Sequence, residues 1–144
     1  MTLVEILVVL AIIGMLFGMG LPAMTRYAKQ MRLNAATRQL VGLISLARST
    51  AISAHEGHAV VIDQSQGRVQ IVNTATGQSL EHVVRLPSFL TVQMLVGGQP
   101  AAESQFTFRS TGALLGRSVA LTLTDQQKSQ TISVTSSTGA VTVQ

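Results

Sequence analysis

The sequence predicts an α+β fold in which a long N-terminal helix packs on a C-terminal antiparallel β domain that resembles a sandwich. Three observations predict this fold: a charge-free run from Ile6 to Thr25, an apolar stripe at helical spacing through residues 26–54, and short β-branched segments between turn signals in residues 55–144. We expect the chain to be organised as a transmembrane helix (residues 1–25), an amphipathic helix (26–54) and a β domain (55–144).

The composition excludes several classes of protein. Of the 144 residues, 47% are hydrophobic and only 11% are charged, whereas soluble domains carry roughly 25% charged residues. This much apolar surface excludes a disordered chain. The absence of cysteine excludes disulfides, thiolate metal sites and cysteine nucleophiles. The net charge of +4 permits an anionic partner without requiring one.

The apolar run has the length of a membrane span. No charge lies between Glu5 and Arg26, and at about 1.5 Å per residue this run covers the roughly 30 Å of a bilayer core. Glu5 lies inside the apolar segment, where an unpaired carboxylate costs a few kcal/mol. Two interpretations follow: the side chain reaches the lipid headgroups, or it pairs with the N-terminal amine of a neighbouring copy.

Small residues and a proline interrupt the same run. Gly14 and Gly18 have the G-x-x-x-G spacing that permits close approach of helices. Pro22 removes one helical hydrogen bond. We expect Gly14 and Pro22 to be points of helix flexibility.

The second half of the helix is amphipathic, and Gly57 is its expected stop signal. The basic residues of this half are interpreted as a solvated face with headgroup contacts. They are Arg26, Lys29, Arg32, Arg38 and Arg48. The predicted buried stripe consists of Leu33, Ala36, Leu40, Leu43, Ile44, Ala47 and Ala51.

The last ninety residues read as eight short antiparallel strands separated by Gly-containing turns. The predicted strands are Ala59–Asp63, Arg68–Asn73, His82–Leu86, Thr91–Val96, Gln105–Arg109, Val119–Thr124, Thr131–Thr135 and Ala140–Val143.

The sequence offers no catalytic, metal or cofactor site. The segment His55–His58 is one residue short of the H-E-x-x-H zinc motif and ends in a predicted helix stop, so a capped helix end with exposed histidines is expected. The acidic residues are scattered and form no pair or cluster. Arg109, Arg117 and Lys128 are isolated cations that serve solubility unless they converge on one face, where they would be candidate DNA contacts.

The N-terminal residues Met1–Gly14 resemble the mature start of type IV pilins and type II secretion pseudopilins. The segments Leu46–Ile52, Val60–Ile62, Phe106–Gly112 and Ile132–Val143 resemble the GspH/FimT group of that superfamily. The resemblance implies a pilin-like fold and a basic leader that a prepilin peptidase removes. Such a leader also reverses the cytoplasmic placement that the positive-inside rule gives to the basic flank of the span.

The resemblance further implies a structural subunit rather than an enzyme. Met1 is then the processed and N-methylated terminus, and Glu5 pairs with the amine of a neighbour during assembly. The subunit starts as a single-pass inner-membrane protein with a periplasmic β domain. It then joins other subunits, through an assembly platform, in a type IV pilus-like filament or a type II secretion pseudopilus, two destinations that remain open. The alternative is a DNA-binding minor pilin that acts in DNA uptake.

Overall fold

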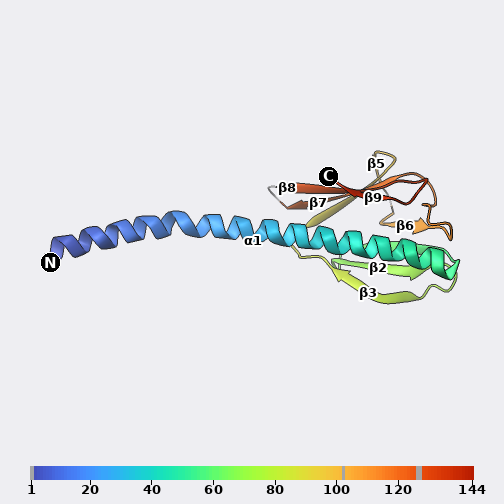
Figure 1. Ribbon diagram of the computed structural model, residues 1–144, viewed down its shortest axis with the longest axis horizontal. Coiled ribbons are helices and arrows are strands. Elements are labelled where there is room, and N and C mark those ends of the chain that lie inside the picture. Colours follow the sequence, from blue (N-terminus) through green and yellow to red (C-terminus); the bar gives the residue numbers. More distant parts are fainter. Residues whose placement is uncertain (1, 102, 126–127) are drawn as a thin grey trace. The chain divides into compact units, whose positions relative to one another are not determined.

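The computed structural model describes residues 2–101, 103–125 and 128–144, without the side chains of residues 18–26. The chain forms two compact units, residues 1–32 and 33–144. Helix α1 (Leu3–Ala54) contributes residues to both units (Figure 1). The expected processing site, Met1, lies outside the described residues.

In the first unit, α1 exposes every described side chain from Leu3 to Phe17. Over the part of the chain whose side chains are described, no helical stretch combines the length and hydropathy needed to cross a bilayer. Residues 18–25 of the expected span Ile6–Thr25, with Gly18 and Pro22 among them, lie outside that part.

In the second unit, α1 buries the predicted apolar stripe. Its seven members are each at most 5% exposed, and Arg38, Ser45 and Ser49 lie exposed on the opposite face, as the spacing predicts. Thr37 is also buried, and its hydroxyl donates a hydrogen bond of 3.0 Å to the carbonyl of Leu33, so its burial leaves this group satisfied.

The helix ends where the amphipathic segment was expected to end, before the expected stop signal at Gly57. Its last residue is Ala54, and His55 adopts the left-handed conformation (φ 56°) that usually favours glycine at this position. Gly57 instead permits a close approach of the backbone, because a Cβ atom there would lie 2.5 Å from the hydroxyl oxygen of Thr74. The glycine therefore marks a contact with the β2–β3 turn and not the helix end.

The described strands form two antiparallel sheets. The four-stranded sheet has the order β3-β2-β1-β6, and its strands are β1 (His58–Asp63), β2 (Arg68–Asn73), β3 (Ser79–Arg85) and β6 (Gln105–Phe108). The five-stranded sheet has the order β5-β4-β7-β8-β9, and its strands are β4 (Thr91–Val96), β5 (Gln99–Pro100), β7 (Val119–Asp125), β8 (Lys128–Val134) and β9 (Val141–Val143).

Eight of these strands overlap the predicted ones, and β5 is additional among the described residues. Two residues are too few to give an alternating hydrophobic pattern, so sequence could not reveal β5. The third strand begins at Ser79 and not at His82, because a register shift between Gln70 and Val72 leaves extra residues on β3.

Both sheets pack on α1. Buried residues of β1, β2 and β6 and of β4, β7 and β8 form one hydrophobic core with the apolar stripe of the helix. Figure 1 shows β7, β8 and β9 on one side of α1 and β2 and β3 on the other. The expectation of a helix on antiparallel sheets is confirmed. Because the helix is shared by the two sheets, we describe the domain as a helix on two sheets and not as a simple sandwich.

Candidate assembly site

Glu5 takes part in a reciprocal cap at the start of α1. Its carboxylate Oε2 accepts a hydrogen bond of 3.3 Å from the backbone amide of Thr2, while the Thr2 hydroxyl accepts one of 3.4 Å from the amide of Glu5. This arrangement is a capping box, which satisfies two amides that the first helical turn leaves free. The signal T-x-x-E is present in the sequence, but sequence reasoning considered only the charge of Glu5 and missed the cap.

The helix that follows Glu5 presents apolar side chains in all directions. Exposed fractions run from 77% at Leu3 to 43% at Ile13, and a Cβ atom built at Gly14 would meet no atom within 4 Å. An exposed apolar surface of this extent usually marks an interaction site. The described contacts within the chain do not explain why residue 14 is a glycine. The open space beside it is consistent with the close approach of another molecule.

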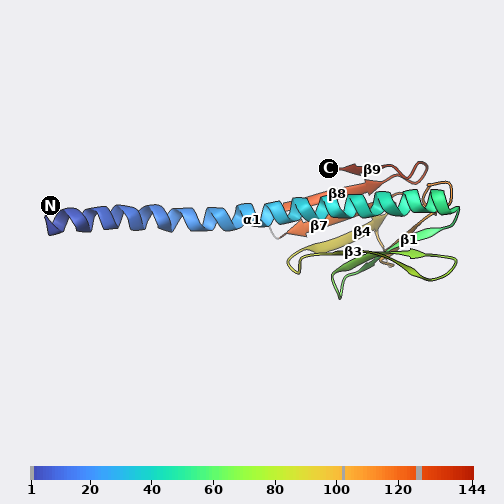
Figure 2. The same cartoon turned by 60° about the horizontal axis from the view of Figure 1, so that its bottom comes forward.

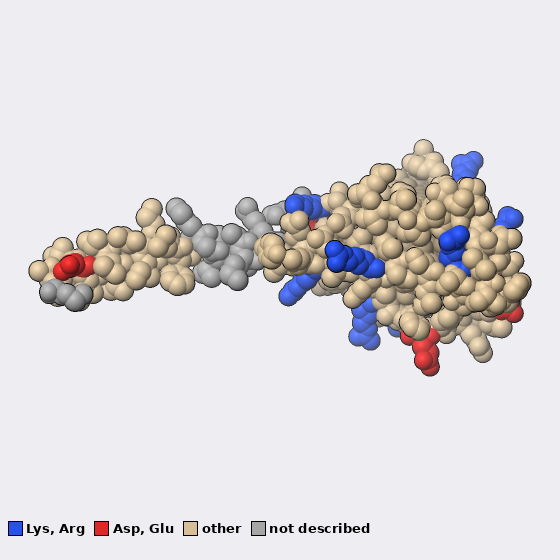
Figure 3. All heavy atoms as spheres, in the orientation of Figure 1, with Lys and Arg blue, Asp and Glu red and all other residues tan. Residues whose placement is uncertain are grey.

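The three candidate DNA contacts do not converge. Arg109 lies in the turn that follows β6, where its amide donates to the carbonyl of Ala113 at 2.8 Å. Arg117 precedes β7 and Lys128 begins β8, and the β7–β8 register places them at opposite ends of β7. Figure 3 shows Lys and Arg side chains scattered over the visible face of residues 33–144 and not gathered into a patch.

Arg48 was expected to be solvated, and the structure corrects this expectation. The side chain is half-buried, and its Nε donates a hydrogen bond of 3.2 Å to the carbonyl of Gly112. A Cβ atom at Gly139 would lie 3.0 Å from the same Nε and would also collide with the carbonyl of Gly112. Arg48 thus ties α1 to two turns, one after β6 and one between β8 and β9. A single cation on a helix gives no signal of such a contact, which depends on residues distant in the sequence.

The segment His55–His58 forms no metal centre. Within the described residues no group of His, Cys, Asp and Glu could hold a metal ion. His58 is 2% exposed, which corrects the expectation that both histidines are exposed. Its Nδ1 lies 3.2 Å from the carbonyl of Glu56, and the Glu56 carboxylate accepts a hydrogen bond of 2.5 Å from the Asn73 side chain. These contacts close the helix–β1 connection against the β2–β3 turn.

A comparison with known families matches residues 36–139 to the family described as type II transport protein GspH. The chain belongs to the GspH family. The match covers α1 from Ala36 onward and the eight strands β1–β8, and it ends in the β8–β9 turn, so it includes the Arg48 contact with Gly112 and Gly139. Membership of this family of structural subunits confirms that the chain is not an enzyme. No curated protein matches the sequence.

Two solved structures share the fold of this GspH family member. The type IV minor pilin FimU of Pseudomonas aeruginosa matches with a TM-score of 0.67 and 16% identity, over 82% of this chain and 92% of FimU. The minor pseudopilin EpsH from the type 2 secretion system of Vibrio cholerae matches with a TM-score of 0.56 and 15% identity, over 81% of this chain and 94% of EpsH. Together with the family match, they confirm the resemblance to type IV pilins and type II secretion pseudopilins.

Proposed function

We propose that this protein is a minor pilin or pseudopilin, a structural subunit that enters a type IV pilus-like filament or a type II secretion pseudopilus through its N-terminal helix. The observation that supports this most strongly is the helical segment Leu3–Phe17, which is apolar on every side and carries Glu5 as its sole charge. A helix that is apolar all round is stable only when lipid or protein surrounds it. In a filament, the same segments of neighbouring subunits surround one another.

Glu5 gives this packing its register. A carboxylate carries two oxygens with about four acceptor positions, and the capping box uses one oxygen, Oε2, once. The other positions are available to the N-terminal amine of a neighbouring subunit. Between apolar helices, where water is excluded, attraction between the two charges is far stronger than in water, and an unpaired carboxylate there would be costly.

The proposed path to the filament begins in the inner membrane. A prepilin peptidase removes a leader and leaves Met1 as the N-methylated terminus, with the apolar helix in the bilayer and the β domain in the periplasm. An assembly platform then transfers the helix from lipid into the filament. Gly14 and Pro22 let the helix adjust as it packs, since glycine and proline weaken helical hydrogen bonding or regularity locally.

Substitution of Glu5 by glutamine separates the charge of Glu5 from its capping role. Glutamine retains the capping box but cannot pair with an amine as an ion. We expect Glu5→Gln to reduce the share of subunit in sheared filaments at least about tenfold, which corresponds to about 1.4 kcal/mol of lost interaction. The measurement compares sheared filaments with the membrane fraction by immunoblot, in cells that carry the native assembly machinery.

Thr2→Ala is the matched control, because it removes the cap and keeps the charge. We expect Thr2→Ala to enter filaments normally, at a cost of about 0.5–2 kcal/mol to the helix start. Normal incorporation of Glu5→Gln together with failure of Thr2→Ala would reject charge pairing and assign Glu5 to the cap alone. Absence of the unsubstituted chain from filaments would reject the proposed function itself. No observation favours the DNA-uptake alternative, because Arg109, Arg117 and Lys128 do not converge.

A further inference from the structure

Two sheet edges flank α1 in residues 33–144, and neither edge has a strand beside it in the described part of the chain. β3 is one outer strand of the four-stranded sheet, whose other outer strand is β6, and β9 is one outer strand of the five-stranded sheet, whose other outer strand is β5. Figure 2 shows them on opposite sides of α1, with both strands running in the direction opposite to the helix. Free edges of this kind are templates for pairing with another chain.

The outer edge of β9 offers unpaired backbone groups. Thr131 on β8 and Gln144 exchange two hydrogen bonds of 2.9 Å, and the amide of Thr135 donates to the carbonyl of Ala140 at 3.0 Å. Bonded and non-bonded pairs alternate in an antiparallel ladder. The register therefore turns the amides and carbonyls of Val141 and Val143 away from β8, towards the free edge.

The outer edge of β3 has the same property. The amide of Leu86 donates to the carbonyl of Gly67 at 2.7 Å, and Val69 lies opposite Val84. By the same alternation Val84 bonds to β2, while the amide and carbonyl of Val83 face away from it. Both free edges thus present one or more valines whose backbone groups have no strand partner in the described chain.

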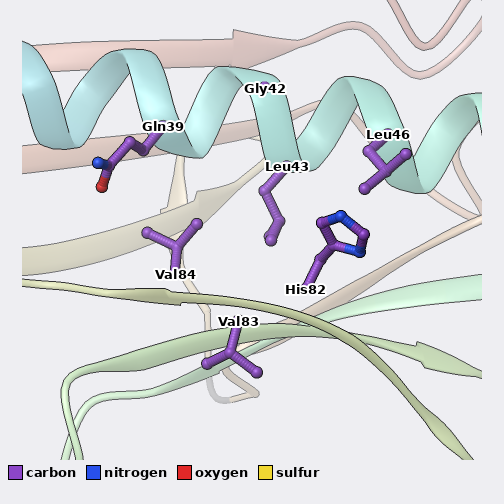
Figure 4. A pocket seen from close by; sticks show the side chains of 7 residues that line it. All are labelled: Gln39, Gly42, Leu43, Leu46, His82, Val83 and Val84. Atoms are coloured by element: carbon purple, nitrogen blue, oxygen red, sulfur yellow. The ribbon is translucent and has the colours of Figure 1, made fainter.

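The side chains at these edges are also poorly protected. Val83 is 43% exposed and Val143 is 49% exposed, and β9 carries none of the charges or prolines that usually prevent association at sheet edges. A groove of about 430 Å³ separates α1 from β3 and is lined by residues that include Leu43, Leu46 and Val84. Figure 4 shows that His82 and Val84 point towards α1, whereas Val83 points away from it.

A second groove, of about 390 Å³, lies between α1 and β9 and is lined by residues that include Arg38, Gln130 and Val143. The side-chain oxygen of Gln130 is buried without a hydrogen-bond donor among the described residues, although buried acceptors normally have one. Arg38 is exposed at this groove, and Glu81 is exposed on β3. Arg85 is exposed on the same strand, so the β3 edge carries one charge of each sign.

We propose that the β3 edge of one copy of this chain adds to the β9 edge of a second copy as a parallel strand. The alternating backbone groups fix the register, with Val83 level with Thr142 of the other copy. The amide of Val83 then donates to the carbonyl of Val141, and the amide of Val143 donates to the carbonyl of Val83, as in a parallel ladder. This register also places Val84 and Val143 on the face that carries α1.

The two edges are different surfaces, so their contact is heterologous and leaves either the β3 edge or the β9 edge free on each copy of a pair. Repetition of such a contact generates a ring or an open helical assembly. Because β3 and β9 lie on opposite sides of α1, side-by-side copies all present α1 on the same face. The inference rests on the proposed function, which it deepens by naming the surface through which the β domains of neighbouring copies meet.

Disulfide cross-linking tests the contact, because the chain contains no cysteine. The double variant Val83→Cys/Thr142→Cys, expressed as the full chain in cells that assemble filaments, is oxidised mildly in sheared filaments and in membranes. We expect a ladder of covalent multimers from the double variant and only dimers from a mixture of the two single variants. The matched control is Val83→Cys/Gln93→Cys, because Gln93 is exposed on β4, which β7 and β8 separate from the β9 edge.

Four outcomes decide the inference. A ladder that is absent from the Gln93 control supports it, in filaments or in membranes. Filament entry without the ladder overturns the edge contact and leaves the proposed function standing. Dimers from Val83→Cys alone show a symmetric β3–β3 contact and also overturn it. A ladder in membranes with no subunit in filaments supports the contact and rejects the proposed function.

Proline at position 83 provides a second test. Val83→Pro removes an amide that faces outward, so the β2–β3 pairing should persist, as checked by an unchanged circular dichroism spectrum. We expect cross-linking between Arg85→Cys/Gln144→Cys, another level pair of the same ladder, to fall to the level of the Gln93 control when Val83→Pro is added. Cross-linking that persists at its full level in the proline variant would overturn the proposed hydrogen bonds.

Discussion

The two units of this chain are stabilised by different interactions. In residues 3–17 the described hydrogen bonds are those of the helix and of the Thr2–Glu5 cap, and every side chain is exposed. In residues 33–144 the same helix buries a stripe of apolar residues against strands from two sheets. Isolated helices are marginal in water, and tertiary packing supplies most helical stability in proteins. The comparison implies that the first unit depends on its surroundings, whereas the second carries its own core.

Matched leucine truncations give the largest expected difference between the units. Leu121 is fully buried in the core, whereas Leu10 is 59% exposed. We expect Leu121→Ala to lower the free energy of unfolding of the β domain by about 2–5 kcal/mol. Leu10→Ala should leave it unchanged. Chemical unfolding of the full chain in detergent, followed by the β signal in circular dichroism, measures both, and similar losses in the two variants would contradict the comparison.

Substitution of one glycine in each unit by alanine tests the same difference between the two units at the level of the backbone. Gly139 has a φ of 64°, and a Cβ atom there would collide with the carbonyl of Gly112. We expect Gly139→Ala to destabilise the domain by more than the roughly 1–2 kcal/mol that a left-handed conformation costs an L-residue. Gly14→Ala meets no atom and should favour the helix by about 0.5–1 kcal/mol.

Incorporation into filaments can be measured for the same two glycine variants. If the close approach of a neighbour requires Gly14, Gly14→Ala should lower incorporation into filaments although it favours the helix. Gly139→Ala should lower incorporation only as far as the domain unfolds. Gly14→Ala that assembles normally would show that the exposed helix does not need this glycine.

Removal of the Arg48 contact should have a smaller effect than the loss of core packing. Its hydrogen bond to the Gly112 carbonyl is charge-assisted and half-buried, and such bonds contribute about 1.5–3 kcal/mol. We expect Arg48→Met to lower stability by about that amount, since methionine keeps part of the packing. Arg38→Met is the matched control, because Arg38 is exposed on the same helix and should cost little. Equal effects of the two substitutions on thermal unfolding would exclude a special role for Arg48.

The features that sequence predicts are those with a local period. The apolar residues from Leu33 to Ala51 recur every three or four residues, and the short β-branched segments are separated by turns that contain glycine. Both the stripe and the strands could therefore be located from the sequence. The family resemblance depended on the N-terminal residues Met1–Gly14 as well as on parts of these segments. Glu5 belongs to two local patterns. It is the single charge of the apolar segment, and it is also the last residue of the capping pattern T-x-x-E, which the charge obscures.

The features that sequence does not predict depend on contacts between distant residues. Arg48 contacts the turns at Gly112 and Gly139. These residues are far apart in the sequence, and no sequence pattern indicates the contact. His55 adopts a left-handed backbone at a position where glycine is usually preferred, so its residue type gave no signal of this conformation. The two free edges at β3 and β9 required the order of strands in both sheets, which alternation along a strand does not specify.

Substitutions in the turn at Asp63 should have the smallest effect on stability. This turn is held by local hydrogen bonds, whereas the rest of residues 33–144 is held by contacts between residues that are distant in the sequence. The Ser65 hydroxyl donates to Asp63 Oδ1 at 2.6 Å and the Gln66 amide donates at 3.1 Å. These bonds, the Ser65 bond first, hold the pKa of Asp63 below its ordinary value. A lowered folded pKa means that the carboxylate stabilises the fold above the ordinary pKa of aspartate, and that this contribution is lost as pH falls through the folded pKa.

Ser65→Ala should therefore raise the pKa of Asp63 towards its ordinary value, and Asp63→Asn should remove the acid-dependent loss of stability associated with this turn. Titration of the carboxyl carbon by nuclear magnetic resonance measures the first effect, and unfolding at a series of acidic pH values measures the second. Because the group is exposed to solvent, we expect the change in stability to be small and confined to the β1–β2 turn. An Asp63 pKa that is unaffected by Ser65→Ala would show that the turn is held by its backbone and not by the serine hydroxyl.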